Sequence, residues 1–153
     1  MFELGCIADD LTGATDLGIN LTTEGMRVLQ LIDVPTGTPD SDIGNRADAV
    51  IVALKSRTCE VQTAVSDSRA SASWLLASGA RRLFFKYCST FDSTPKGNIG
   101  PVTVALMEAT GSDFAVVCPA SPENGRSVRD GRLLVHGMPL AQTHMRHHPL
   151  TPM

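Results

Sequence analysis

The apolar positions of this chain fall into short continuous runs that alternate with longer amphipathic stretches. Continuous apolar runs are typical of strands covered on both faces, and they occupy residues 4–8, 26–32, 49–54, 83–87 and 114–118. Apolar spacing of three and four predicts helices over residues 14–21, 60–78 and 99–109. Because the two patterns alternate, the sequence predicts an α/β fold with a mostly parallel sheet and helices on both faces.

Two stretches do not follow this alternation. Residues 34–46 are rich in Pro, Gly, Thr and Asp, which is typical of a surface loop. Residues 126–135 alternate around Asp130-Gly131, a pair that favours a tight turn, so we predict a C-terminal β-hairpin. The proline-broken residues 144–153 resemble a linker, and we therefore expect residues 1–153 to be the first domain of an incomplete two-domain protein.

Length, charge and composition argue against several classes of partner. A chain of 153 residues fits one domain, and a net charge of −3 without charge blocks argues against a nucleic-acid partner. No apolar run approaches the ~18 residues of a membrane span, so we expect no membrane partner. The acidic start lacks a secretory signal, and the four cysteines form no CxxC pair, so we expect free thiols in the cytoplasm.

Polar groups follow the predicted strands at the point where each strand ends. Asp9 and Asp10 follow the first strand, residues 55–58 the third, residues 88–98 the fourth and residues 119–126 the fifth. Right-handed crossovers place the carboxyl ends of parallel strands at one edge of the sheet. Ligands of open α/β sheets bind outside that edge, so we predict that these segments line one crevice.

The loop after the fourth strand is the richest of these segments. Residues 84–98 hold two lysines, one aspartate and the hydroxyl groups of Ser89, Thr90, Ser93 and Thr94. Lysines and hydroxyls suit the oxyanions of a ligand, and a carboxylate suits its hydroxyls or a proton. A solvated turn is the alternative. Gly97-Asn98 opens the next helix, where free backbone N–H groups favour an anion, unless it is a plain helix start.

The other segments offer acids and a guanidinium. Asp9 or Asp10 can cap the following helix, and the adjacent pair can also hold a divalent cation or act as a general base. Arg57 can grip a carboxylate bidentately, unless Ser56-Arg57 is a solvated turn. No phosphate-binding GxxxxGK[ST] or GxGxxG motif occurs, and His147 and His148 lack partners at metal-ligand spacing. We therefore predict no metal site.

Several of these motifs resemble one family of kinases. The residues are Ile-Ala-Asp-Asp-Leu-Thr-Gly-Ala-Thr-Asp at 7–16, Ala-Leu-Lys-Ser-Arg-Thr at 53–58, Phe-Lys-Tyr-Cys-Ser-Thr-Phe-Asp-Ser-Thr-Pro-Lys-Gly-Asn-Ile-Gly-Pro-Val at 85–102, Cys-Pro-Ala through Pro-Glu-Asn-Gly-Arg at 118–126 and His-Pro-Leu-Thr-Pro-Met at 148–153. Together they resemble the N-terminal domain of the four-carbon acid sugar kinase family, in its 3-oxo-tetronate kinase branch. The resemblance covers essentially the whole chain. Ser121 and Arg129 depart from it, because aromatic residues are expected there.

The resemblance implies ATP-dependent phosphorylation of the terminal hydroxyl of a four-carbon acid sugar. The N-terminal domain would hold the acid sugar, and a C-terminal domain absent here would bind ATP with Mg²⁺. The candidate site positions that it implies are Asp9, Asp10, Ser56, Arg57, Lys86, Asp92, Ser93, Thr94, Lys96, Gly97 and Asn98.

Each role follows from the chemistry of phosphoryl transfer, which needs positioning and charge neutralisation. Arg57 and Lys86 are suited to the substrate carboxylate. Asp10 or Asp92 is suited to orient the attacking hydroxyl and take its proton, and the sequence does not choose between them. Lys96 and the Gly97 N–H are suited to the incoming phosphoryl group.

Two alternatives stay open from the sequence. The chain can be a stand-alone acid-sugar-binding or regulatory module without catalysis, or a Mg²⁺-dependent phosphatase or phosphotransfer domain that uses Asp9-Asp10. A homodimer is also an open alternative.

Overall fold

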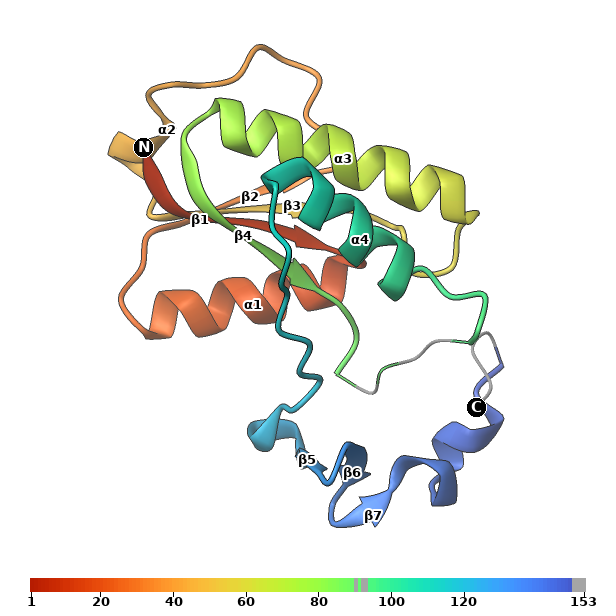
Figure 1. The fold of residues 1–153 in the computed structure, drawn as a ribbon. Helices are drawn as coiled ribbons and strands as arrows, with labels where there is room; N and C mark the ends of the chain where they lie inside the picture. Colours follow the sequence, from red (N-terminus) through yellow and green to blue (C-terminus); the bar gives the residue numbers. More distant parts are fainter. Residues whose placement is uncertain (90, 92–93, 150–153) are drawn as a thin grey trace.

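The computed structural model describes residues 1–89, 91 and 94–149 of the 153-residue chain. Within these residues, four parallel strands form a sheet in the order β2-β3-β1-β4 (Figure 1). The strands are β1 (Phe2–Ala8), β2 (Val28–Ile32), β3 (Ala49–Ala53) and β4 (Ala80–Lys86). Each strand overlaps an apolar run that the sequence singled out, although β4 begins at Ala80 rather than Leu83.

The long helices cover both faces of this sheet. Helix α1 (Leu11–Thr23) lies on one face, and α3 (Val61–Ala77) and α4 (Ile99–Thr110) lie on the other (Figure 1). The predicted α/β fold is thereby confirmed. Helix α4 ends at Gly111, whose φ of 64° is the left-handed conformation that glycine adopts at little cost.

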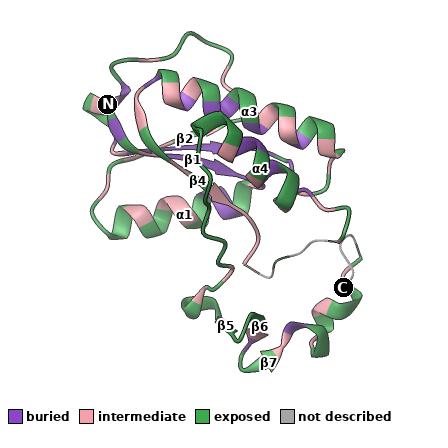
Figure 2. Cartoon of the chain, viewed as in Figure 1, coloured by how far each residue is buried: buried purple, intermediate pink, exposed green. Residues whose placement is uncertain are grey.

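Two apolar clusters lie on opposite sides of the sheet. Strand β3 belongs to both: Val50 and Val52 pack into the cluster beneath α3 and α4, and Ile51 packs into the cluster beneath α1. All five residues of β3 are buried because the strand has β1 and β2 as neighbours and helices on both faces (Figure 2). The continuous apolar run is the sequence signature of this position.

A small antiparallel sheet follows the main domain. Its strands are β5 (Arg126–Arg129), β6 (Arg132–Val135) and β7 (Met138–Pro139). The turn between β5 and β6 uses Asp130 and Gly131 at φ of 50° and 71°, a pair of positive values that matches the twist of a hairpin. The predicted hairpin is confirmed, and β7 extends it. Three short 3₁₀ turns complete this part: η1 (Pro122–Asn124), η2 (Leu140–Gln142) and η3 (His144–His147).

One predicted strand is wrong. Residues 114–118 form no strand, and every one of them is exposed. Phe114 is 74% exposed and Val116 is 78% exposed. The run is as apolar as β3, but it lies outside β4, where neither a neighbouring strand nor a helical layer of the described chain encloses it.

Two smaller features complete the description. The expected loop over residues 34–46 ends in the short helix α2 (Ile43–Arg46), in which Ile43 is buried against the main core. In the described part of the chain, every helix is too short or too polar to cross a membrane.

Candidate functional site

Three charged residues meet at the carboxyl ends of β1 and β3. Arg57 donates from Nε to Asp9 Oδ2 at 3.0 Å and from Nη2 to Asp9 Oδ1 at 2.8 Å. The same Nη2 lies 2.9 Å from Asp10 Oδ1. The guanidinium of Arg57 is therefore directed at Asp9 and Asp10.

The backbone holds the strand ends in register at this point. The Asp9 N–H donates to the Lys86 carbonyl at 3.0 Å, so the end of β1 stays beside the end of β4. On the other side, the Ser56 and Arg57 N–H groups donate to the Asp9 carbonyl at 3.0 and 3.2 Å. This pattern extends the parallel ladder past the strands and fixes the Asp9–Arg57 pair across the edge.

Asp10 also caps helix α1. Its Oδ1 accepts the Gly13 N–H at 2.7 Å, and its extended backbone is typical of an N-cap residue. The cap predicted for one of the two acids therefore falls on Asp10. Among the described residues, Asp10 Oδ2 has no hydrogen-bond partner.

Gly13 brings Lys86 to the same place. A Cβ at Gly13 would lie 2.6 Å from Asp10 Oδ1 and 3.5 Å from Lys86 Nζ, so any side chain at this position would have to displace the Asp10 carboxylate. Lys86 Nζ donates to the Tyr87 carbonyl at 2.9 Å. Gly13 was not among the site residues predicted from the sequence. Its spacing three residues after Asp10 is the signal that indicates this role.

The electrostatics of the cluster are dominated by mutual pairing. Asp9 is buried, with 4% of its side chain exposed, whereas 25% of the Arg57 side chain is exposed. Burial lowers the pKa of Arg57, but the hydrogen bonds and charge of Asp9 outweigh burial, so that this pKa is raised. Two acids face two bases here, and the guanidinium keeps its charge at every physiological pH.

Asn98 and Ser56 lie behind this cluster. The buried Asn98 side chain donates to the Ser56 carbonyl at 2.7 Å and to the Cys59 carbonyl at 2.9 Å. The Asn98 side-chain amide therefore connects the loop after β3 to the start of α4 through two hydrogen bonds. Ser56 Oγ is buried without a hydrogen-bond partner in the described part of the chain, so it keeps its capacity to bind a polar group.

The loop after β4 contributes an exposed turn. The Gly97 N–H donates to the Thr94 carbonyl at 2.8 Å, and the Lys96 N–H donates to Thr94 Oγ1 at 3.2 Å. The Lys96 side chain is exposed. Asp92 and Ser93, which the sequence analysis assigned to the site, lie outside the described residues.

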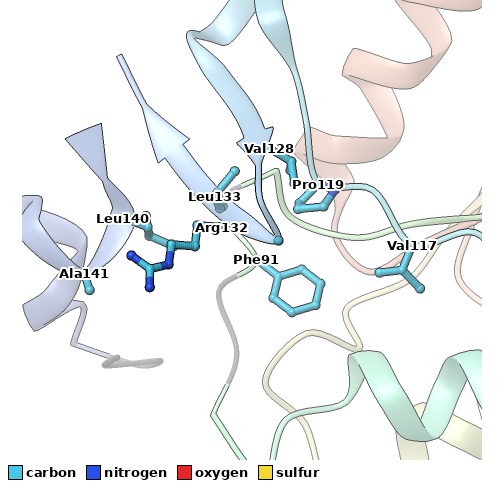
Figure 3. Close-up of a pocket in the computed structure, with 9 residues that line it drawn as sticks. Phe91, Val117, Pro119, Val128, Arg132, Leu133, Leu140 and Ala141 are labelled. Carbon is cyan, nitrogen blue, oxygen red and sulfur yellow. The ribbon is translucent and has the colours of Figure 1, made fainter. Parts of the chain in front are cut away.

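The segment at residues 119–126 stays apart from the charged cluster. Asn124 donates to Ser121 Oγ at 2.9 Å, and Arg126 donates to the Asn124 carbonyl at 2.7 Å, so these contacts stay within their own turn. Pro119 lines a separate, mainly apolar cavity of about 510 Å³ between the loop after β4 and the small sheet (Figure 3). Other residues around this cavity are Phe91, Val117, Val128, Arg132, Leu133 and Leu140.

The described residues do not offer an obvious metal centre. No group of three His, Cys, Asp or Glu side chains gathers among them. Asp9 is paired through both oxygens with Arg57, and Asp10 uses Oδ1 for Arg57 and for the helix cap. The phosphatase alternative needs a nucleophilic aspartate with a free metal-binding face, and of these two carboxylates only Asp10 Oδ2 is unengaged within the described residues.

The fold and the charged edge define a class of small-molecule-binding domain. Residues 4–153 match the model of the sugar-binding N-terminal domain family, and the chain belongs to that family. Among curated relatives, the 3-oxo-tetronate kinase of Brucella melitensis is 53% identical over 99% of this chain and 34% of its own length. The 3-oxo-tetronate kinase of Cupriavidus necator is 56% identical over 98% of this chain and 34% of its own length. The chain thus spans about a third of these relatives.

Solved structures share the fold. A crystal structure from Salmonella typhimurium LT2 matches with a TM-score of 0.94 at 50% identity, covering 100% of this chain and 36% of that one. A Bordetella bronchiseptica protein, solved with bound citrate as a domain-swapped dimer, matches with a TM-score of 0.79 at 31% identity, covering 98% and 37%.

Proposed function

We propose that this chain is the substrate-binding part of an ATP-dependent kinase that phosphorylates the terminal hydroxyl of a four-carbon acid sugar of the 3-oxo-tetronate type. The observation that carries the proposal is the Asp10–Arg57 contact, with Lys86 beside it, at the edge where α/β sheets bind ligands. Membership of a sugar-binding family and relatives named 3-oxo-tetronate kinase support the same substrate class. We expect such a metabolic kinase to work in the cytoplasm.

ATP and Mg²⁺ belong to the rest of the polypeptide in this proposal. The chain has no phosphate-binding glycine motif, and its described residues do not gather three metal ligands. We therefore derive no step through Mg²⁺ from this domain. A C-terminal ATP-binding domain is the expected partner, and a homodimer stays a prediction. The domain-swapped dimer of the Bordetella protein supports looking for one.

Asp10 is the preferred general base. Its Oδ1 is held by Arg57 and the Gly13 N–H, which leaves Oδ2 for a substrate hydroxyl. In the proposed step, Asp10 takes the hydroxyl proton while the oxygen bonds to the γ-phosphorus of ATP and ADP leaves. Asp92 is the alternative base.

The substrate carboxylate is assigned to lysines rather than to Arg57. The fork of Arg57 is directed at Asp9 and Asp10, so we propose that Arg57 orients these acids. Lys86 and Lys96 then supply the charge that meets the carboxylate, and the hydroxyls of Ser56, Ser93 and Thr94 bind the remaining oxygens. The citrate bound to the Bordetella relative, itself a hydroxy acid with carboxylates, supports an acidic ligand for this family.

Calorimetric titration of the chain with a panel of four-carbon sugar acids tests the binding proposal. We expect one class of acid to bind and the Lys86→Met variant to bind at least about tenfold more weakly, because a charge-assisted hydrogen bond contributes about 1.5–3 kcal/mol. Lys55→Met is the matched control, since Lys55 is exposed just after β3. If every acid gives only heats of dilution, the chain does not bind acid sugars by itself and the proposal fails.

Two further measurements test the catalytic assignment. In a full-length relative, replacement of the aspartates aligned with Asp10 and Asp92 by asparagine should reduce turnover at one of the two positions. Unchanged turnover at both removes the general-base role. ATP alone should not bind the 153-residue chain, and submillimolar binding would contradict the division of labour between the two domains.

A further inference from the structure

Residues 114–118, called here the outer segment, are apolar in sequence and exposed at every position. The sequence Phe-Ala-Val-Val-Cys carries no polar side chain, yet Phe114, Val116 and Val117 are 74%, 78% and 50% exposed. Soluble chains rarely leave several large apolar side chains uncovered in one short segment, so such a segment marks an interaction surface.

The outer segment lies at the open edge of the main sheet. Strand β4 is the last strand in the described sheet, with β1 on its inner side. Val117 and Phe91 line one cavity, and the Phe91 ring packs edge-on against Tyr87 with ring centroids 5.6 Å apart, so the end of the outer segment lies near the residue that follows β4. A hydrogen bond between the Tyr87 side chain and the Cys118 backbone, which opposes the rise that burial causes in the pKa of Tyr87, agrees with this position. Figure 1 shows the chain running from the end of α4 past β4 toward the small sheet.

The face of the sheet that carries Phe84 is incompletely covered. Phe84 is paired with Cys6, so both side chains point toward the α1 side. Leu83 and Phe85 point the other way and pack into the cluster beneath α3 and α4. Helix α1 packs mainly over β2 and β3, and Phe84 stays 42% exposed. The position beside α1, over β4 and the outer segment, holds no helix of the described chain.

The geometry points to an amphipathic helix as the occupant of this position. We propose that Phe84 and Val117 dock such a helix, supplied by the polypeptide that full-length relatives carry beyond the third that this chain matches. Once covered, the outer segment pairs with β4 as a fifth parallel strand. This inference concerns the fold of the whole protein and does not depend on the proposed substrate.

Two features of the surface define the chemistry of that helix. Val117 also lines the cavity of about 510 Å³, so the apolar surface continues from the sheet into a hollow that takes bulky side chains (Figure 3). Arg82 lies on the same face of β4 as Phe84, is 76% exposed, and reaches Glu3 only at 4.0 Å. The helix should therefore present an apolar stripe flanked by a carboxylate that pairs with Arg82.

Amide hydrogen exchange on two proteins tests the proposal. In the 153-residue chain, the amides of residues 114–118 should exchange as fast as those of an unstructured loop. In the full-length Brucella melitensis 3-oxo-tetronate kinase, the aligned amides should exchange at least about 100-fold more slowly, because they join a covered ladder. Equally fast exchange in both proteins overturns the proposal. Protection that grows with the concentration of the 153-residue chain assigns the surface to a second copy and overturns it as well.

A fluorescent apolar dye, anilinonaphthalene sulfonate, tests the surface itself. Phe84→Gln and Val117→Gln should each lower dye fluorescence of the 153-residue chain by about twofold, because each removes a large part of the exposed apolar area. Val104→Gln is the matched control, since Val104 is 55% exposed on α4. An equal loss in the control, or no loss in either test variant, shows that no continuous docking surface exists.

Discussion

Strand β3 and the outer segment have almost the same sequence character and opposite environments. Ala-Val-Ile-Val-Ala in β3 is fully buried, whereas every residue of Phe-Ala-Val-Val-Cys in the outer segment is exposed. The difference is their neighbours: β3 lies between β1 and β2 beneath helices on both faces, and the outer segment lies beyond the edge strand β4. An apolar run thus indicates that a segment is suited to burial, but it does not show which part of the polypeptide packs against it.

The largest expected effect on stability comes from breaking the buried Asp9–Arg57 pair at the edge of the sheet. Arg57→Met leaves the buried Asp9 carboxylate without its bidentate partner, so we expect a loss of about 3–5 kcal/mol in the free energy of unfolding. Urea denaturation followed by circular dichroism measures it. Arg27→Met is the control, because the Arg27–Asp48 pair is exposed and its loss should cost far less. Similar losses in both variants would contradict the buried character of the Asp9–Arg57 pair.

A matched pair of valines tests the two apolar runs directly. Val52→Ala in β3 removes two buried methyl groups and should lower the free energy of unfolding by about 2 kcal/mol. Val116→Ala in the outer segment removes the same atoms from a side chain that is 78% exposed, and the change should stay within about 0.5 kcal/mol. Equal effects would mean that the outer segment is buried in solution. In a full-length relative, the difference between the two aligned positions should shrink.

Most of the fold was predictable because periodicity and strand-end chemistry are local signals. The alternation of apolar runs and amphipathic stretches gave the parallel sheet, and Asp130-Gly131 gave the hairpin. The fifth strand was wrong because burial depends on tertiary neighbours that a run of five apolar letters does not encode. The short helix α2 was missed because turn-forming residues dominate the surrounding loop.

The position of the charged cluster at the sheet edge was predictable from the sequence, but its individual contacts were not. That Asp10 and Arg57 meet follows from strand ends sharing one edge, which is a property of the topology. That Arg57 turns its fork to Asp9 and Asp10, and that Asn98 binds two carbonyls, depends on side-chain competition that residue type alone does not resolve. The roles of Asp92 and Ser93 stay predictions because both residues lie outside the described part of the chain.

Two glycines of helix α1, Gly13 and Gly18, differ in how much space surrounds them. A Cβ at Gly13 meets Asp10 Oδ1 at 2.6 Å, whereas a Cβ at Gly18 meets Ile51 Cδ1 at an ordinary 3.6 Å. Gly13→Ala should therefore displace the cap and lower the free energy of unfolding by about 1 kcal/mol, and it should weaken acid-sugar binding. Gly18→Ala should be neutral or stabilising by up to about 1 kcal/mol through helix propensity. Thermal unfolding and calorimetry of both variants decide this, and an equally harmless Gly13→Ala would contradict the close approach.

The smallest expected effect compares two thiols, one in β1 and one at the end of the outer segment. Burial raises the pKa of Cys6 to about 12, whereas Cys118 is exposed. Because the thiolate is the nucleophile, iodoacetamide should modify Cys118 in the native chain and reach Cys6 only after unfolding. Mass spectrometry of the alkylated peptides measures both sites.

The raised pKa of Cys6 also gives the sign of a pH effect. The folded state holds the Cys6 proton more tightly than the unfolded state, in which a thiol titrates near about 8.5. Protonation of Cys6 therefore contributes fully to the free energy of unfolding below that pH, and the contribution is lost as the pH rises toward about 12. The free energy of unfolding then falls by at most about 1.4 kcal/mol per pH unit. Between pH 8 and about 9.5, the Cys6→Ala variant should therefore lose less stability than the unaltered chain, although its cavity makes it less stable at pH 7. Parallel pH curves for the two proteins would show that Cys6 is accessible to solvent, as Cys118 is.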